Sequence, residues 1–407
     1  YVLNRTAFSK TAGLIAAMTM AVSPFAVYLS QEARHYTVPM LFIIMALLGL
    51  VRLQQNLRQE RISIGVWIGW IVVNGIGFYI HYFFALAIVA QILTLIELQI
   101  RQPFKRSNWV AIALSTLGIG LLTLPWLPTF ISHITRSETD WLEVPRSGFL
   151  SFIAPLYQLL AGWLVMTVSF PVEDQSRWIR IPSAILMLVV AGWLAWQVFK
   201  GLRQLWNDPK THWETRTLTS FVMWVVLEFL AVVYVLGKDI TQVPRYNFIY
   251  YPAVCALIGA SIWNRAKSYI TVLVIGLISS VFVITNIVFQ KPYLPDRVAD
   301  NIITPNSDRP LVVMAYNDFQ DIALGLSFAL TLNPKRVDFA FVSRLQGYEQ
   351  FWNQIPKLKS QPKHFWAIAP GLKRTDFPEK LLLSGKTCTP NPNKYYRIGI
   401  PYQGYDC

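Results

Sequence analysis

Residues 64–99 read IGVWIGWIVVNGIGFYIHYFFALAIVAQILTLIELQ, and Glu97 is the only Asp, Glu, Lys or Arg among them. His81 divides this stretch into two apolar segments, 64–80 and 82–99. An α-helix rises about 1.5 Å per residue, so either segment is about long enough to cross the hydrocarbon core of a bilayer. The pattern therefore predicts two membrane-spanning helices joined by a tight turn at His81.

Similar apolar segments occur along the first 290 residues. We predict nine spans, at 11–29, 37–53, 64–80, 82–99, 109–129, 182–200, 217–236, 246–264 and 269–288. A tenth segment, 149–169, carries Pro155, Gln158 and Gly162 in a weaker apolar run. It could either span the membrane or lie in the interface.

The basic residues favour one of these two topologies. If 149–169 does not span, one side of the membrane receives 14 of the 21 Lys and Arg residues in the first 290. If it spans, the split falls to 12 against 9, which is a weaker bias, so we prefer the interfacial interpretation. The basic side is then cytoplasmic, and the segments 30–36, 130–181 and 291–407 are extracytoplasmic.

The composition divides the chain into two domains and excludes several classes of protein. Of 407 residues, 54% are hydrophobic and 14% are charged, and the formal net charge is +14. Residues 1–290 hold 33 of the 58 charged residues, so the tail 291–407 is much richer in charge. No block of like charge indicates a nucleic-acid partner. No glycine-rich phosphate loop, Cys-x-x-Cys pair or Gly-x-Ser-x-Gly elbow is present.

The tail has the pattern of a compact α/β domain. Strands are predicted at 311–314, 337–342, 364–368 and 396–400, with helices near 318–331 and 347–358. Cys388 and Cys407 both lie in this extracytoplasmic tail, where a disulfide between them is allowed. Two unrelated free thiols are the alternative. The tail is either a packing lid or, given aromatics such as Trp352 and Trp366, a domain that helps to select the acceptor.

Ionisable residues gather at the predicted outer ends of the spans, where a functional site can be partly buried. The turn 30–36, SQEARHY, contains Glu32, Arg34 and Tyr36. His81 and Tyr82 form the second place, and Arg245 with Tyr246 the third. A guanidinium matches the geometry of phosphate, so Arg34 and Arg245 are predicted to bind a phosphate group. Ordinary turn polarity and snorkelling of the arginine are the alternatives. Because the preferred topology puts the three turns on one side of the membrane, we expect Glu32, Arg34, His81 and Arg245 to line one cavity, and the alternative is a set of unrelated interfacial residues.

These residues also carry a resemblance to a known family. Ser23-Pro24 followed by Tyr28 to Tyr36, YLSQEARHY, resembles a signature of bacterial relatives of the dolichyl-phosphate-mannose protein mannosyltransferases. That group of GT-C fold membrane glycosyltransferases includes the aminoarabinose transferases. Further similarities are YIHYF at 79–83 with Gln91, LPWLP at 124–128, and PRY at 244–246 with Pro252.

The resemblance implies a GT-C-like helical bundle, residues 1–290, followed by a small extracytoplasmic α/β domain, residues 291–407. It implies an inverting transferase that moves a sugar from a polyprenyl-phosphate donor to a protein or lipid acceptor outside the cytoplasm. In a bacterium, the plasma (inner) membrane is then the expected location. The family's main acidic motif lies in an external loop that would precede Tyr1, so Glu32 is expected to be a supporting catalytic residue.

The remaining site residues follow from the same hypothesis. Tyr36, His81, Tyr82 and Tyr246 are expected to contact the substrate. Glu32 and His81 could share a divalent cation, although two candidate ligands are weak support for one. No other cofactor is indicated. A transporter or flippase of lipid-linked sugars is the alternative function, but such a protein needs ionisable groups along its path, and the predicted spans contain only Glu97 and Glu228 away from their ends.

Overall fold

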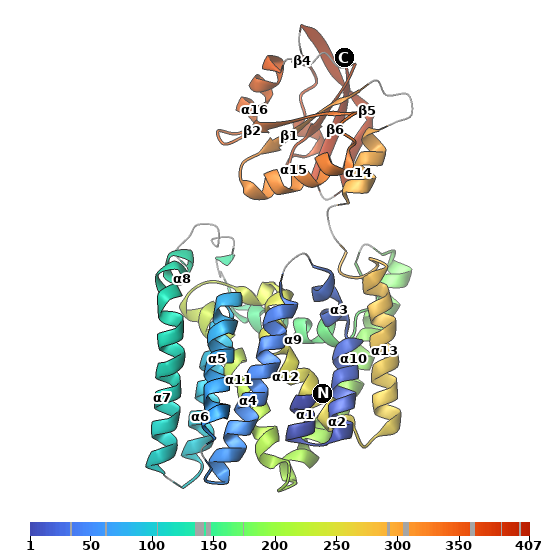
Figure 1. Cartoon of the computed structure of the whole chain (residues 1–407). Helices are drawn as coiled ribbons and strands as arrows, with labels where there is room; N and C mark the ends of the chain where they lie inside the picture. The colour runs from blue at the N-terminus through green and yellow to red at the C-terminus, as the bar shows by residue number, and fades with distance from the viewer. Residues whose placement is uncertain are drawn as a thin grey trace. The chain divides into compact units, whose positions relative to one another are not determined.

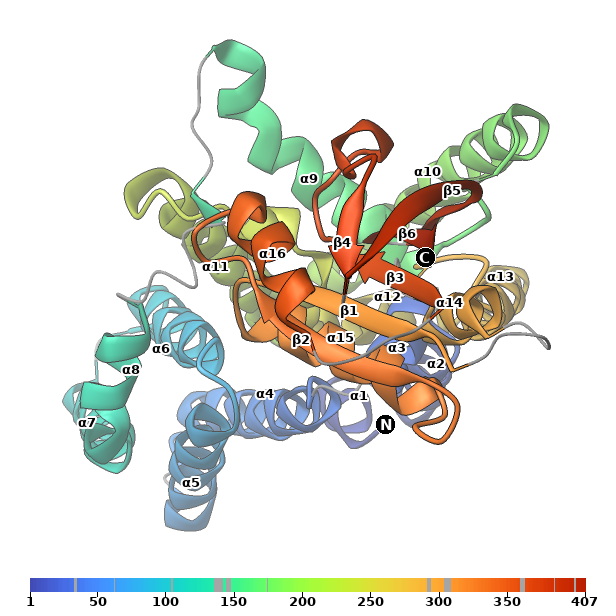
Figure 2. The same cartoon turned by 90° about the horizontal axis from the view of Figure 1, so that it is seen from above.

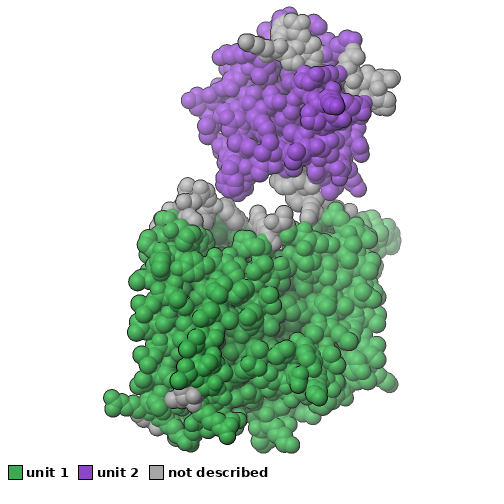
Figure 3. All heavy atoms as spheres, in the orientation of Figure 1, with its two compact units in different colours: residues 1–290 green, residues 291–407 purple. Residues whose placement is uncertain are grey.

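The computed structural model describes the whole chain except residues 33–34, 62, 104, 135–141, 144–147, 174, 291–293, 304–308, 359–362, 384 and 399. It contains two compact units, Tyr1–Gln290 and Lys291–Cys407 (Figure 3). This division falls where the charge distribution predicts it.

The first unit is a bundle of helices (Figure 1). Its α-helices are α1 (Val2–Ala7), α2 (Lys10–Ala21), α3 (Pro24–Gln31), α4 (Thr37–Arg58), α5 (Ile64–Ile80), α6 (Phe84–Ile100), α7 (Arg106–Thr123), α8 (Leu127–Ile134), α9 (Phe149–Thr167), α10 (Arg177–Asn207), α11 (His212–Val235), α12 (Tyr251–Ile262) and α13 (Ala266–Ile284). Short 3₁₀ helices lie at η1 (Leu124–Trp126), η3 (Ile240–Gln242) and η4 (Pro244–Ile249). The chain is thus a helical, multi-pass membrane protein with a small α/β domain, as predicted.

Within the described residues, six helices are long and apolar enough to cross a membrane, or seven if the bent pair α2 and α3 forms one span. The helices α5 and α6, each predicted as a span, are apolar but have 17 residues each. The predicted span 246–264 is wrong as a single helix. Its first residues belong to η4, and α12 has only 12 residues. Pro244 and Pro252 explain this, because proline lacks the N–H that a continuous helix requires.

The helices α2 and α3 are bent by 54° at the break between them. Pro24 occupies the first turn of α3, a position that proline favours. A side chain from another helix satisfies one backbone group at the break, since Ser280 Oγ of α13 donates to Val22 O (2.7 Å). Ser23, a residue of the break itself, donates from its Oγ to Met166 O of α9 (2.8 Å). The Tyr251 hydroxyl donates in turn to Ser23. A broken helix is tolerated within a membrane when neighbouring groups replace its lost hydrogen bonds.

The helix α9 corresponds to the ambiguous segment 149–169. Figure 2 shows α9 extended across the view, whereas α5, α6 and α7 are seen nearly end-on. Its contacts follow one end of the bundle: Tyr234 Oη donates to Phe152 O, Thr241 Oγ1 lies 2.7 Å from Gln158 Oε1, and Trp163 Nε1 donates to Tyr250 Oη (2.8 Å). By length and composition α9 is one of the six helices that could cross a membrane. A spanning helix would contact residues at all depths, however, so the arrangement of its contacts favours the interfacial interpretation.

The second unit is a six-stranded sheet with strand order β2-β1-β3-β6-β5-β4. Its strands are β1 (Leu311–Tyr316), β2 (Asp338–Ser343), β3 (His364–Ile368), β4 (Leu381–Leu383), β5 (Lys386–Ile398) and β6 (Ile400–Asp406), and its helices are α14 (Pro295–Ile302), α15 (Phe319–Thr331) and α16 (Tyr348–Gln354), with η5 (Ile355–Lys357) and η6 (Arg374–Asp376). The strands β2, β1 and β3 are parallel, and β6, β5 and β4 are antiparallel.

The two faces of this sheet have separate cores. Val313 and Phe365 pack with Phe351 of α16 on one face, while Val312 and Phe328 of α15 pack on the other. The predicted strands at 311–314, 337–342 and 364–368 and both predicted helices are confirmed. The single strand predicted at 396–400 is wrong, because two strands, β5 and β6, pair there as an antiparallel hairpin.

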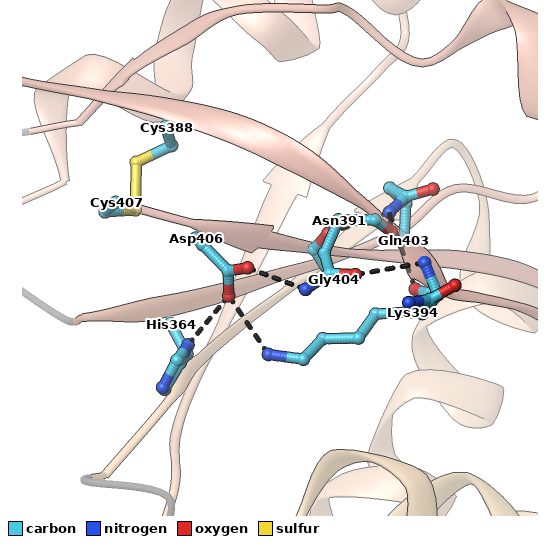
Figure 4. Close-up of polar contacts among 9 residues, drawn as sticks. His364, Cys388, Asn391, Lys394, Gln403, Gly404, Asp406 and Cys407 are labelled. Atoms are coloured by element: carbon cyan, nitrogen blue, oxygen red, sulfur yellow. Dashed lines mark hydrogen bonds and ion pairs between the residues drawn. A yellow bond between two sulfur atoms is a disulfide. The ribbon is translucent and has the colours of Figure 1, made fainter.

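Cys388 and Cys407 form a disulfide, the pairing that the sequence predicts. Figure 4 shows an ionic cluster beside it, in which Asp406 accepts from Lys394 (3.0 Å) and Asn391 (2.7 Å) and lies 3.1 Å from His364 Nδ1. Burial raises the pKa of Asp406, but its hydrogen bonds and the charge of Lys394 outweigh this effect and keep the pKa below its usual range. The cluster and the disulfide together fix the last strand to β3 and β5.

Candidate functional site

Three turns that are far apart in the sequence meet at one end of the bundle. The ring of His81, which follows α5, lies 5.5 Å from the ring of Tyr36 and 4.9 Å from that of Phe248 in η4. Tyr36, the residue before α4, also lies 5.6 Å from Phe248. Tyr36 and Phe248 are buried, and His81 is half-buried. The chain thus builds one aromatic cluster from residues separated by more than 200 positions.

The cluster extends through two further rings to Arg245. The ring of Phe83 lies 5.6 Å from His81 and 4.5 Å from Tyr246. The guanidinium carbon of Arg245 lies 5.7 Å from the centre of the Tyr246 ring. We use the name outer aromatic cluster for Tyr36, His81, Phe83, Tyr246 and Phe248, after the side of the membrane on which the sequence predicts these turns. Arg245 is therefore positioned at the edge of this cluster by η4.

Arg245 has an unused hydrogen-bond donor. Its Nε atom is buried and finds no hydrogen-bond partner among the described residues. A buried donor without an acceptor costs about 1–3 kcal/mol, more when the group is charged. An anionic ligand that accepts from this nitrogen would remove the cost, so the geometry suits a phosphate or carboxylate.

His81 is held as a neutral imidazole. Its Nδ1 atom accepts from the backbone N–H of Phe83 (3.2 Å), which leaves Nε2 to carry the proton. Burial lowers the pKa of His81 to about 4, and the nearby His35 lowers it further in the same direction. Above that pH the side chain offers one N–H donor and no charge.

Acid should destabilise the fold through His81. The folded state holds a pKa of about 4, below the ordinary value of 6.5, so the unfolded state binds more protons between these values. The linked stabilisation is fully present above pH 6.5 and is lost as the pH falls toward 4. We expect a loss of about 2 kcal/mol between pH 7.5 and pH 5.

This loss is measured as the change in unfolding free energy or midpoint with pH, for wild type and for His81→Gln. Glutamine keeps a neutral donor but cannot titrate, so the unfolding free energy of the variant should fall by about 2 kcal/mol less than that of wild type on acidification. An identical pH dependence in both proteins would contradict the assignment.

The structure places the other predicted site residues in different ways. Glu32 directly follows α3 and is half-buried, and Arg34 lies outside the described residues. Tyr82 packs its ring 5.7 Å from Phe130 of α8, on a different side of the turn from Phe83. In the described parts of the chain, no three His, Cys, Asp or Glu residues lie close enough together to hold a metal ion. The roles of Glu32, Arg34 and Tyr82 remain predictions, as does a cation shared by Glu32 and His81.

A cavity of about 340 Å³ lies beside the turn that carries Glu32. Its lining is almost wholly apolar and comes from α2, α3 and α4, including Met20, Val27, Met40 and Ile44. Ser30 and Thr37, which flank the turn, are its two lining residues with hydroxyl side chains. Its volume falls within the range of about 300–1,000 Å³ that is common for ligand pockets. Because Arg34 is not described, a single cavity shared by Glu32, Arg34 and Arg245 remains a prediction.

Gln91, one of the residues in the family resemblance, makes hydrogen bonds inside the bundle. It is fully buried, donates to Asn74 Oδ1 (2.8 Å) and accepts from Trp70 Nε1 (2.8 Å). These three side chains link α5 to α6 inside the bundle. Gln91 therefore supports the helices that carry the turn at His81.

Sequence reasoning missed Phe248 and the polar contacts of α9. Phe248 is an apolar residue in an apolar stretch, and nothing in its neighbourhood distinguishes it from core. Asp239 is buried, accepts from the Thr241 N–H (3.1 Å), and lies in the connection between α11 and η4. The sequence feature that could have revealed this polar group near α9 is an aspartate between two apolar segments.

The fold and this end of the bundle define a class: a multi-pass membrane protein whose helix ends form an aromatic site with a partly buried arginine. Residues 1–128 match the family model described as dolichyl-phosphate-mannose-protein mannosyltransferase. The match confirms the part of the resemblance that lies within residues 1–128, and it indicates a glycosyltransferase of that type. The similarities at 244–246 and Pro252 lie outside the matched residues. No curated protein and no solved structure matches the chain.

Proposed function

We propose that this protein is an inverting glycosyltransferase that uses a polyprenyl-phosphate sugar and acts on a protein or lipid acceptor at the outer face of a bacterial plasma membrane. One observation carries the proposal. The turns at Tyr36, His81 and Arg245 meet at one end of the bundle, and the buried Nε of Arg245 has no hydrogen-bond partner in the part of the chain that the structure describes. The match to the mannosyltransferase family over residues 1–128 covers two of these turns.

Each residue then has a chemical role. As the bond from the anomeric carbon to the phosphate oxygen breaks, negative charge grows on the departing polyprenyl phosphate. Arg245, with Arg34, would stabilise that charge through bidentate hydrogen bonds. The acceptor oxygen attacks from the opposite face of the sugar, which inverts the anomeric carbon. Its proton passes to a base that we do not assign within this chain.

The neutral residues of the cluster would orient the sugar. His81 can donate from Nε2 to a sugar oxygen without adding a charge that competes for the phosphate. Tyr36 and Tyr246 provide flat apolar surfaces of the kind on which sugar rings stack, and Glu32 can accept from a sugar hydroxyl. The apolar cavity beside α3 would take the start of the polyprenyl tail.

The flippase alternative has less support. Glu97, one of the two acidic residues within the predicted spans, pairs with Arg216 (3.3 Å) and with Arg101 (3.3 Å). The pair of Glu97 and Arg216 connects α6 to α11, so a structural role accounts for this carboxylate. Both carboxyl oxygens of Glu228 are buried with no hydrogen-bond partner in the described ranges. One such group does not make a path across the membrane.

The two functions are separated by an assay without an energy source. The full-length protein, reconstituted in vesicles, is supplied with a panel of radiolabelled polyprenyl-phosphate sugars and an extract of acceptor lipids and proteins. We expect label to move from one donor to an acceptor, with the anomeric configuration inverted. Movement of intact donor between leaflets without sugar transfer would support the flippase and contradict the proposal.

A further inference from the structure

A second lipid-facing groove lies between α4 and α5, away from the outer aromatic cluster. It has a volume of about 460 Å³ and is lined on α4 by Met45, Leu48, Gly49 and Arg52. These positions recur every three or four residues, so they form one face of the helix. The facing wall on α5 consists of Gly65, Val66, Gly69, Trp70 and Val73, with Ser63 at its end.

The polarity of the groove changes along its length. The helix α4 starts beside the outer aromatic cluster at Tyr36 and ends at Arg58, so Arg52 marks the opposite end of the groove. From Met45 to Arg52 the groove is about 10 Å long. Arg52 and Ser63 are the lining residues with polar side chains in addition to the Trp70 indole, whose N–H donates to Gln91. The groove is therefore apolar along most of its length, with one cationic side chain, that of Arg52, at one end.

Two glycines keep the groove open. A Cβ atom added at Gly65 or Gly69 would meet no atom of the described residues within 4 Å, so the space directly above these two glycines is open. On the opposite wall, Gly49 lies directly against Trp70, where a methyl group would approach the indole to 2.8 Å. The groove is thus open above the two glycines of α5, whereas α4 packs closely against Trp70 at Gly49.

We propose that this groove binds one anionic phospholipid, with its phosphate at Arg52 and part of an acyl chain over Gly65 and Gly69. The apolar walls match hydrocarbon, and the exposed guanidinium matches a phosphate that carries net negative charge. Arg58, the last residue of α4, and Arg61, in the connection to α5, add positive charge at this end of the helix, while Glu60 between them pairs with Lys105. A zwitterionic lipid would gain the apolar contact without the net attraction. The proposal does not depend on the glycosyltransferase activity.

The test is lipid retention by the full chain, measured by native mass spectrometry after equilibration in micelles with equal phosphatidylglycerol and phosphatidylcholine. We expect at least fivefold more phosphatidylglycerol than phosphatidylcholine on the wild type. Arg52→Gln should abolish that preference. Gly69→Leu should fill the groove and reduce retention of both lipids at least fivefold.

Matched controls come from α10. Arg203 is an exposed arginine there, and a side chain at Gly192 would also meet no atom within 4 Å. Arg203→Gln and Gly192→Leu should retain both lipids within twofold of wild type. Equal retention of the two lipids by the wild type, or unchanged retention in both groove variants, would overturn the proposal. So would displacement of phosphatidylglycerol by an equal amount of a long-chain polyprenyl phosphate, which would assign the groove to that lipid.

Discussion

Replacing Arg245 by lysine should lower sugar transfer about 100-fold, which corresponds to about 2.7 kcal/mol in the activation free energy. The guanidinium lies over Tyr246, and its buried Nε has no partner among the described residues. Lysine keeps the charge but replaces a planar fork by a single ammonium, so it cannot make two parallel bonds to one phosphate. The measurement is initial rate against donor concentration in the reconstituted transfer assay.

Because the proposed contact strengthens as the phosphate departs, the loss should appear mainly in kcat rather than in KM. Arg34→Lys should have an effect in the same direction. Arg58 gives a matched control, since its guanidinium also lies over an aromatic ring, that of Trp213 at 5.2 Å, outside the candidate site. Arg58→Lys should keep wild-type turnover. Wild-type turnover in Arg245→Lys, with a normal unfolding temperature, would refute the phosphate assignment.

The meeting of the three turns follows from topology and could be predicted. Each turn joins or precedes an apolar segment, and the distribution of basic residues puts Tyr36, His81 and Arg245 on one side of the membrane. Once they share a side, the packing of the helices limits how far apart they can be.

The parts that could not be predicted depend on packing between distant residues. The family signature marked Ser23, but its bonds to Met166 and Tyr251, which hold the break before α3, join residues more than 140 positions apart. The composition of 149–169 suits a span equally well, and its orientation follows from contacts with η3 and η4. The C-terminal hairpin was missed because β5 contains Pro390 and Pro392, which in a sequence argue against a strand.

Gln91 shows a different limit of sequence reasoning. A buried glutamine in an apolar segment marks either a ligand site or a structural hydrogen bond, and the two have the same local pattern. Its partners, Trp70 and Asn74, lie on the neighbouring helix. Only their placement assigns Gln91 to the structural class.

Removing the disulfide should have the largest effect on the stability of the second unit. Cys388 and Cys407 are 19 residues apart, and closing a loop of that size is worth roughly 3 kcal/mol in the chain-entropy model. The bond joins the end of the chain to the strand β5, at the position where β5 pairs with β4. Its loss should release β6 at its C-terminal end, where Asp406 bonds to Lys394 and Asn391.

We therefore expect Cys388→Ser with Cys407→Ser to lower the unfolding free energy of residues 291–407 by about 3 kcal/mol. Hydrogen exchange of the full chain measures this effect, because the amides of β3, β5 and β6 should exchange faster by about two orders of magnitude. Those in the helices of the first unit should not change. Reductant should reproduce the effect in wild type and add nothing in the double variant. Cys255→Ala is the control, since that buried thiol forms no disulfide and leaves the reductant response intact. Unchanged exchange in the sheet after reduction would show that the ionic cluster at Asp406 holds β6 without the covalent bond.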